Sequence, residues 1–217
     1  MITLYHCSDA RSFRPLWTME ELGLDYELKM LAFPPRVLAK DYLRINPLGT
    51  IPTLVDGETK MTESAAMIEY LIARHGPGEI GVAADDPVFG AYLNWLHHGE
   101  ATLTFPQTIV LRYTRLEPAE RRLPQAAEDY GKWFLARLRL ADAAVAERTW
   151  LLGERFTGAD ISVGYALLLA TSLGLDERFT PATKNYWARL QGRDGFQRAK
   201  ARQKRDALAQ GLGRSPL

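Results

Sequence analysis

The chain has 217 residues, of which 47% are hydrophobic, an ordinary share for a packed globular protein with one large domain or two small ones. Lysine and arginine together number 27, against 26 aspartates and glutamates, so the chain has no strong field to attract nucleic acid or an anionic membrane. The single cysteine, Cys7, excludes an internal disulfide framework. No basic leader precedes an apolar stretch, and no window approaches the ~20 apolar residues of a membrane span. We therefore expect a soluble, cytoplasmic protein whose partners are small molecules or other proteins.

The first third of the sequence alternates strand-like and helix-like segments. Residues 2–5 are β-branched or aromatic, and an apolar helical face runs from Phe13 to Gly23. Residues 26–31 alternate with period two, as a half-buried strand does. A short helix is expected over residues 36–44, before a proline breaks it. This part of the chain predicts a strand, a helix, a strand and a second helix.

A hairpin and a further helix complete the pattern. Asp56-Gly57 is a strong turn signal between strands expected at 53–55 and 60–62. A helix is expected from Ser64 to His75, because Gly76 can take the left-handed conformation that ends a helix. The order of these elements predicts a small α/β domain over residues 1–78.

Strand signals nearly vanish in the rest of the sequence. Residues 79–87 contain glycine and proline and suit a linker. The segments that follow are rich in Ala, Leu, Arg and Glu, which favour helix. We expect an all-α domain over residues 88–217, with a frayed polar tail from Arg202 and helices at 88–115, 126–146, 158–173, 185–192 and from Gly195 onward.

The segment NPLGTIPTL, residues 46–54, places a proline directly before a strand. Pro52 cannot donate a ladder hydrogen bond, so it must start the strand or lie at an edge, which leaves the main-chain groups of Ile51 unpaired. A cis bond between these two residues would turn those groups outward to pair with an extended, peptide-like ligand. The alternative is a trans proline that simply starts a strand, the commoner arrangement.

Glu63 and Ser64 stand where the helix over residues 64–75 begins. The first turn of a helix presents free N–H groups and a partial positive charge, which suit a carboxylate. The Glu63 carboxylate beside it could receive an ammonium group, so the two together would fit an α-amino acid. The alternative is ordinary N-capping by Ser64 with a solvated Glu63.

Taken together, these motifs resemble the glutathione-binding domain of the cytosolic glutathione transferases. Residues 16–27 look like the first helix and second strand of many bacterial members, and the pattern is most similar to theta- and zeta-like classes. Residues 156–162, FTGADIS, look like the family's buried capping box, in which Thr157 would cap a central helix and Asp160 would reach back to it. The resemblance covers nearly the whole chain and implies a thioredoxin-like N-terminal domain followed by an all-α C-terminal helical domain.

The resemblance also implies how the chain would hold glutathione. Ile51, with Pro52 cis, would pair its main chain with the cysteinyl part, and Glu63 and Ser64 would hold the γ-glutamyl end. Two basic side chains could pair with the glycyl carboxylate by charge, or could simply be solvated: Arg36 and Lys40.

The sequence offers more than one residue that could stabilise the glutathione thiolate. A free thiol has a pKa near ~8.5, so the anion needs a hydroxyl, a cation or a helix N-terminus. Serine-using classes place a hydroxyl between the first strand and the first helix, but here Asp9 or Ala10 takes that position. We expect Ser12, with Arg11 beside it, to act at the start of the helix, and Ser8 to be the second candidate. The alternative for Ser12 is ordinary helix capping.

Cys7 lies at the end of the first strand, where glutaredoxin-like proteins keep a redox thiol. It has no resolving cysteine, so we expect a buried structural thiol. His97, His98 and Glu100 are interpreted as structural and not as metal ligands, since adjacent helical histidines point in different directions.

The sequence therefore predicts a homodimeric transferase that conjugates the glutathione thiolate to small hydrophobic electrophiles, as in detoxification, and that needs no metal. The electrophile would bind against the segment from Trp95 to Tyr113, with core packing as the alternative role of that segment. Two other functions stay open. One is a glutathione-dependent thiol reductase or isomerase that uses Cys7, and the other is a non-catalytic glutathione-binding or regulatory protein on the same fold.

Overall fold

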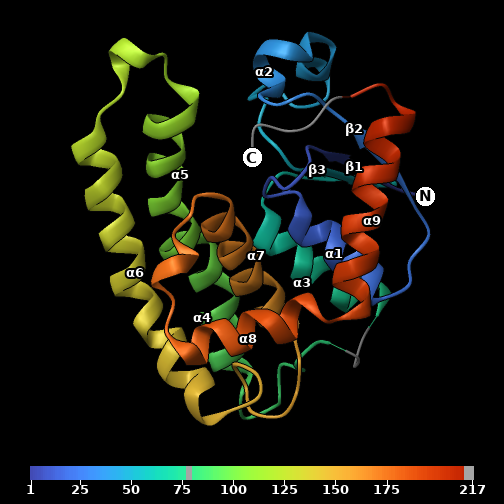
Figure 1. Ribbon diagram of the computed structural model, residues 1–217. Helices are drawn as coiled ribbons and strands as arrows, with labels where there is room; N and C mark the ends of the chain where they lie inside the picture. The colour runs from blue at the N-terminus through green and yellow to red at the C-terminus, as the bar shows by residue number, and fades with distance from the viewer. Residues whose placement is uncertain (77–79, 213–217) are drawn as a thin grey trace. The chain divides into compact units, whose positions relative to one another are not determined.

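A computed structural model of the chain describes residues 1–76 and 80–212 (Figure 1). The chain divides into two compact units. Unit 1 comprises Met1–Gly81 together with Gly192–Leu217, and unit 2 comprises Val82–Gln191.

Unit 1 is built on a four-stranded sheet with the order β2-β1-β3-β4. β1 (Ile2–His6) runs parallel to β2 (Tyr26–Met30) and antiparallel to β3 (Thr53–Asp56), which pairs with β4 (Thr59–Met61). Gly57 follows β3 with a φ of 58°, a conformation that glycine adopts without the steric cost that other residues meet. The expected hairpin at Asp56-Gly57 is therefore confirmed.

Two helices that pack against each other supply most of the core of this sheet domain. α1 (Phe13–Glu21) contacts α3 (Ser64–His75). The expected helix over 36–44 is two short pieces, α2 (Pro35–Leu38) and the 3₁₀ helix η1 (Lys40–Arg44), because Ala39 leaves the helical region with φ −131° and ψ 65°. Side chains that are completely buried include Leu4, Phe13, Leu16, Trp17, Leu54, Met67, Ile68 and Leu71, and each contributes roughly 1.5–3 kcal/mol of burial free energy.

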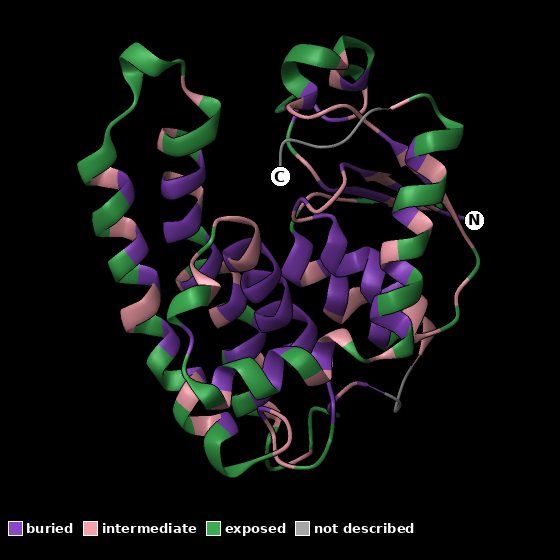
Figure 2. Cartoon of the chain, viewed as in Figure 1, coloured by how far each residue is buried: buried purple, intermediate pink, exposed green. Residues whose placement is uncertain are grey.

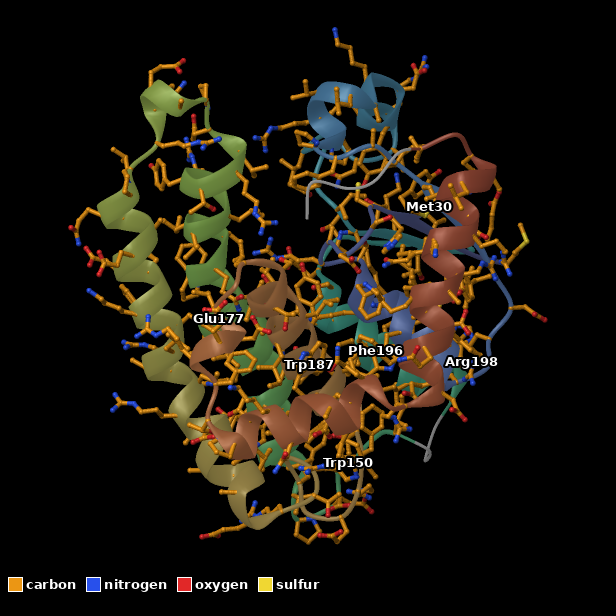
Figure 3. All side chains as sticks on the ribbon, in the orientation of Figure 1. Met30, Trp150, Glu177, Trp187, Phe196 and Arg198 are labelled. Carbon is orange, nitrogen blue, oxygen red and sulfur yellow. The ribbon has the colours of Figure 1, made fainter. Side chains whose placement is uncertain are left out.

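The last helix, α9 (Asp194–Ala209), contacts α1 and β2 and so belongs to unit 1. This differs from the division expected from the sequence, in which residues 88–217 form one helical domain. The ring of Phe196, labelled in Figure 3, meets the rings of Phe13 and Trp17 edge-on, with centroids 5.4 and 5.0 Å away. The apolar face of α9 is thus complementary to α1.

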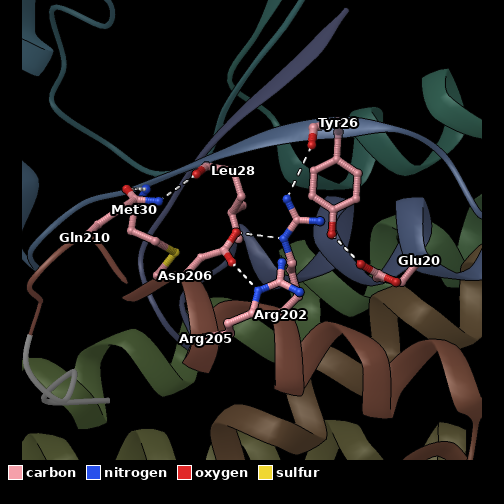
Figure 4. A network of polar contacts seen from close by, with 8 residues as sticks. All are labelled: Glu20, Tyr26, Leu28, Met30, Arg202, Arg205, Asp206 and Gln210. Carbon is pink, nitrogen blue, oxygen red and sulfur yellow. Dashed lines mark hydrogen bonds and ion pairs between the residues drawn. The ribbon is translucent and has the colours of Figure 1, made fainter. Parts of the chain in front are cut away.

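α9 also continues well past the point where a frayed tail was expected. It runs to Ala209, so the expectation is wrong for residues 202–209, and residues 213–217 lie outside the described part. Two contacts of Arg202 help to keep residues 202–209 helical (Figure 4). Its Nε is 2.7 Å from the Asp206 carboxylate one turn away, and its guanidinium lies over the Tyr26 ring.

Gln210, just beyond α9, covers the outer edge of the sheet (Figure 4). Its Oε1 accepts a hydrogen bond from the Met30 N–H at 2.9 Å, and its Nε2 donates to the Leu28 carbonyl at 3.0 Å. Because β2 is an edge strand, this amide takes the place of a neighbouring strand and satisfies main-chain groups that would otherwise be open to pairing.

Unit 2 is helical in its described residues, apart from an isolated bridge between Trp150 and Gly153. Residues 80–88, which include most of the expected linker 79–87, form neither helix nor strand. The helical elements are α4 (Phe89–His97), η2 (His98–Thr104), α5 (Phe105–Leu111), η3 (Arg112–Leu116), η4 (Ala119–Arg121), α6 (Pro124–Glu147), α7 (Gly158–Ser172), η5 (Asp176–Arg178) and α8 (Pro181–Gln191). Of the helices that the structure describes, none is both long enough and apolar enough to cross a membrane.

α7 is the central helix of this unit and is buried along most of its length (Figure 2). The expected capping box at its start is confirmed: the Thr157 N–H donates to Asp160 Oδ2 at 2.9 Å, and Thr157 Oγ1 accepts from the Ala159 N–H at 3.3 Å. The predicted fold class, a thioredoxin-like α/β domain with an all-α part, is confirmed.

Candidate active site

The two segments that the sequence predicts to hold a ligand meet at one end of the β3–β4 hairpin. In the register of this hairpin Leu54 pairs with Met61. Continuing the register by two residues brings Pro52 opposite Glu63. The start of β3 and the start of α3 are therefore close together, although the hairpin separates them in sequence.

The loop after β1 lies at the same end of the sheet. β1 and β3 are antiparallel, with Tyr5 opposite Thr53. Continuing this register by two residues brings Cys7 opposite Ile51. The segment in which the sequence predicts the thiolate-stabilising group thus adjoins the segment predicted to bind the ligand backbone.

Ile51 keeps its main-chain groups available for a ligand. The preceding carbonyl, that of Thr50, accepts hydrogen bonds from the Tyr42 hydroxyl at 2.7 Å and from Asn46 Nδ2 at 3.0 Å, which holds the segment in place. The bond between Ile51 and Pro52 is cis, as expected. No hydrogen bond within the described part of the chain uses the N–H or C=O of Ile51. An extended peptide could therefore pair with both groups.

The predicted cations Arg36 and Lys40 are both exposed, and Arg36 contacts the loop that leads to Ile51. Arg36 lies against Gly49, where an added Cβ would come within 2.6 Å of the Arg36 Cβ, and Gly49 has a φ of 61°. Within residues 1–76 and 80–212 neither cation forms an ion pair with a carboxylate. Arg36 is therefore placed beside the loop that leads to Ile51, with its charge in solvent.

The start of α3 has donors without protein acceptors. Glu63 occupies the capping position and makes no side-chain cap, and the first N–H of this helix that bonds within it is that of Met67, to the Glu63 carbonyl at 3.0 Å. The N–H groups of Ser64, Ala65 and Ala66 bond to no atom of the described residues. Ser64 therefore does not cap this helix, contrary to the alternative interpretation of the sequence. The three N–H groups at the helix start are available to an anion.

Arg14, which the sequence reasoning did not single out, stands behind Ser64. Its guanidinium is completely buried, and Nη1 donates to Ser64 Oγ at 3.2 Å. Because arginine can only donate, the Ser64 oxygen is the acceptor and its own proton is available to another acceptor. The only sequence signal was a basic residue within the apolar stretch of α1, between Phe13 and Pro15.

The three candidates for thiolate stabilisation occupy different surroundings. Ser12 is completely buried, and its hydroxyl both donates to the Cys7 carbonyl and accepts from the Cys7 N–H, each at 3.3 Å. A ligand sulfur would have to displace one of these bonds to reach it. Ser8 and Arg11 are partly exposed in the turn between β1 and α1.

Cys7 is a buried thiol. Its side chain is completely shielded from solvent, and burial raises its pKa to about 12. Because the thiolate is the reactive form, burial disfavours reaction of this thiol at neutral pH. This agrees with the structural role that we expected. Across the described ranges, no three His, Cys, Asp or Glu side chains gather as a metal site would require.

At one end of its sheet, the thioredoxin-like domain thus presents an unpaired backbone segment, an uncapped helix start and an exposed carboxylate. These groups can pair with the main chain, the carboxylate and the ammonium of a small peptide, respectively. Comparison with known proteins points the same way. Residues 10–74 match the family model described as glutathione S-transferase, N-terminal domain.

Relatives extend the match over most of the chain. It is 28% identical over 180 residues to glutathione S-transferase 3 of Schizosaccharomyces pombe, covering 78% of this chain and 74% of that protein. It is 29% identical over 196 residues to the glutathione S-transferase GstB of Escherichia coli K12, covering 88% and 93%. It is 26% identical over 230 residues to a tetrachloro-p-hydroquinone reductive dehalogenase of Sphingobium chlorophenolicum, covering 87% and 91%.

Solved structures show the same fold. A ternary complex of BphK, a bacterial glutathione transferase, superposes with a TM-score of 0.82 at 22% identity, covering 93% of this chain and 99% of that chain. A theta-class glutathione S-transferase of Xanthomonas axonopodis pv. citri with glutathione bound has a TM-score of 0.76 at 25% identity, covering 91% and 96%. The family model over residues 10–74 and the relatives support the cytosolic glutathione transferase superfamily for this chain, as its motifs predicted. The solved structures show that the fold is shared.

Proposed function

We propose that this protein is a glutathione transferase that conjugates the thiolate of glutathione to small hydrophobic electrophiles. The main support is the meeting of three features at one end of the sheet: the unpaired backbone of Ile51, the uncapped start of α3 and the exposed Glu63 carboxylate. The names of the relatives, most of them glutathione S-transferases, support a glutathione-dependent enzyme in general.

Each part of glutathione would have a partner. The cysteinyl main chain would pair with Ile51, and the γ-glutamyl carboxylate would accept from the free N–H groups of α3 and from the Ser64 hydroxyl, whose proton Arg14 leaves free. The Glu63 carboxylate would face the γ-glutamyl ammonium. The glycyl carboxylate would be near two exposed cations, Arg36 and Lys40.

The bound thiol would then lie toward the loop after β1, where Ser12, Arg11 and Ser8 are the proposed stabilising residues. In a substitution, the thiol proton goes to solvent, a carbon–sulfur bond forms and a carbon–halogen bond breaks. Lowering the pKa of the thiol raises the fraction of thiolate at neutral pH, which is the contribution required of the protein.

Binding and turnover are tested separately. We expect glutathione to bind in a calorimetric titration and a chromogenic aryl halide to be turned over. Binding without turnover of any electrophile or disulfide would favour the non-catalytic binding protein instead. The stabilising group is tested by single substitutions to Ala of Ser8, Ser12 and Arg11. For each variant, the ultraviolet absorbance of the bound thiolate is followed against pH. An unchanged titration in all three variants would contradict this assignment.

The electrophile is proposed to bind against the segment Trp95–Tyr113 of unit 2. Phe105 is 55% exposed there, whereas its neighbour Pro106 is buried. An exposed aromatic ring suits an apolar electrophile. Phe105→Ala is expected to raise the KM for an aryl halide and to leave the Kd for glutathione unchanged. We also propose that the protein is a homodimer and that it is cytoplasmic. Sedimentation of the purified protein measures its oligomeric state.

A glutathione-dependent reductase is the second candidate, because one relative is named a reductive dehalogenase. In this chain such chemistry through a protein thiol would have to use Cys7, which is buried with a pKa raised to about 12. We therefore expect Cys7→Ala to keep the turnover of the aryl halide. Loss of turnover by a variant that keeps the urea midpoint of the unchanged protein would favour the reductase.

A further inference from the structure

Four side chains join α9 to the loop after β1, and we call them the α9–loop cluster: His6, Asp9, Lys200 and Gln203. Gln203 Nε2 and Lys200 Nζ each donate to Asp9 Oδ1 at 2.7 Å. Gln203 Oε1 accepts from the Asp9 N–H at 3.2 Å and is 2.9 Å from His6 Nε2. Both the main chain and the side chain of Asp9 are therefore held by α9, from residues more than 190 positions along the sequence.

The residue that is held has an unusual backbone conformation. Asp9 has a φ of 57°, and no other non-glycine residue that the structure describes has a positive φ. Aspartate reaches this region more readily than most residues, but at a cost that its surroundings must offset. The next residue closes the turn, since the Ala10 N–H donates to the Cys7 carbonyl at 3.1 Å. The path of the loop from Cys7 to Ser12 therefore depends on how Asp9 is held.

The Gln203 amide of α9 has a defined hydrogen-bond partner for each of its polar atoms. Gln203 and His6 are both buried, and a buried amide costs free energy unless it is hydrogen-bonded. With Nε2 of Gln203 committed to the Asp9 carboxylate, its Oε1 must accept from His6, so His6 carries its proton on Nε2. Its Nδ1 has no hydrogen bond of normal geometry. Each polar atom of the Gln203 amide is thus used to fix the loop or the strand before it.

We propose that Gln203, assisted by Lys200, is a positioning residue for catalysis, which holds the Cys7–Ser12 loop in the conformation that presents its thiolate-stabilising group to glutathione. This rests on the proposed transferase function. The glutathione clamp uses other elements, the start of β3 and the start of α3. Disturbing α9 should therefore change thiol activation and leave glutathione affinity in place.

The expected effect of Gln203→Ala is a rise of about one unit in the pKa of bound glutathione. Near neutral pH this is roughly a tenfold fall in kcat, with the KM for glutathione changed less than about twofold. At a pH well above both pKa values the difference should disappear, because the thiol is then ionised in either protein. A general loss of structure would instead lower activity at every pH.

The matched control is Gln210→Ala. Gln210 is also a glutamine beside α9 whose amide bonds main-chain groups, but those of the β2 edge. A second variant, Gln203→Glu, keeps the acceptor oxygen and removes the donor to Asp9, and it covers the case in which Gln203→Ala does not fold. We measure kcat, KM and the thiolate absorbance against pH for all four proteins, with hydrogen exchange of residues 7–12 as a readout that needs no turnover.

The proposal expects faster exchange of residues 7–12 and a raised thiol pKa in both Gln203 variants, but not in Gln210→Ala. A thiol pKa equal to that of the unchanged protein in folded Gln203→Ala and Gln203→Glu would overturn it while leaving the proposed function intact. If the unchanged protein does not bind glutathione, the proposed function fails, and this assignment fails with it.

Discussion

Glu63 gives the most direct residue-scale test of the proposed clamp. Its carboxylate is exposed and has no ion-pair partner in the described chain, so its proposed role is to receive the γ-glutamyl ammonium. We expect Glu63→Gln to raise the Kd for glutathione about fivefold, the upper range for an exposed ion pair. Calorimetric titration measures the change.

The control for this test removes the same charge elsewhere. Glu58 is exposed in the turn between β3 and β4, so Glu58→Gln should leave the Kd unchanged. An analogue with glutaryl in place of γ-glutamyl lacks the ammonium and should bind the Glu63→Gln variant and the unchanged protein equally. If the analogue distinguishes the two proteins as strongly as glutathione does, Glu63 does not bind the ammonium.

His6 should make stability depend on pH. Its complete burial lowers its pKa from 6.5 to about 4, against smaller raising effects of Gln203 and Asp9. The folded state therefore keeps the ring neutral where the unfolded state takes up a proton. Stability from this group is fully present above about pH 6.5 and is lost as pH falls toward 4, by about 3 kcal/mol in total.

Urea unfolding between pH 7 and pH 4 measures this slope. In His6→Gln the residue no longer titrates, so the free energy of unfolding should fall less steeply with acid than in the unchanged protein. Other groups titrate in both proteins and cancel in the difference. Equal slopes would show that His6 is not held neutral.

The sequence singled out the residues of the proposed clamp but not the residues that support them. Ile51, Glu63 and Ser64 lie in local motifs, and a proline before a strand or a carboxylate before a helix has a meaning that can be derived from neighbours alone. Arg14 and Gln203 act across about 50 and 190 residues of sequence, and such partners depend on packing. Ser12 lay at the helix start as predicted, yet its hydroxyl is turned to the main chain of Cys7, which no local pattern specifies.

At the scale of elements, the capping box of α7 offers a test of stability separate from catalysis. The Asp160 carboxylate is completely buried and accepts from the Thr157 N–H at 2.9 Å, the Leu151 N–H at 3.0 Å and the Tyr186 hydroxyl at 2.8 Å. Asp160→Ala would leave these donors unsatisfied, at about 1–3 kcal/mol each. We expect the free energy of unfolding to fall by at least about 3 kcal/mol.

Thr157→Ser is the conservative comparison, because it keeps the capping hydroxyl and should cost little. Thermal and urea unfolding measure both variants. Asp160→Ala with the stability of the unchanged protein would contradict the view that this carboxylate holds the start of α7 and the loop before it.

Helices with a clear start and apolar face were predicted closely, and irregular ones were not. The helix over 64–75 matches α3, and that over 158–173 ends one residue from α7. The segment over 88–115 was expected as one helix, but π-helical turns at η2 and η3 interrupt it. In the last turn of α4, just before the first of these, the Leu96 carbonyl accepts from the Ser162 hydroxyl at 2.6 Å. That partner lies in α7, so the interruption depends on packing and has no local signal.

At the scale of the whole chain, the main departure from the sequence-based prediction is where the last helix belongs. Composition and periodicity identify α9 as one more amphipathic helix after a series of helices, and neither says which partner its apolar face meets. The structure joins it to the sheet domain through Phe196, the α9–loop cluster and Gln210. Unit 1 is therefore complete only when the end of the chain has joined its beginning, and contacts of such long separation slow folding.

We expect Phe196 to be central to the packing of α9 in the sheet domain. It is 3% exposed and meets Phe13 and Trp17 edge-on, so Phe196→Ala removes a buried ring and leaves a cavity at the base of α9. We expect a loss of about 3–5 kcal/mol in the free energy of unfolding. Leu208→Ala, in the same helix but 70% exposed, should change it by less than about 0.5 kcal/mol. Hydrogen exchange should also quicken in α1 and β2 of the Phe196 variant, because α9 covers both. If the two variants are equally stable, the end of the chain is not what completes the sheet domain.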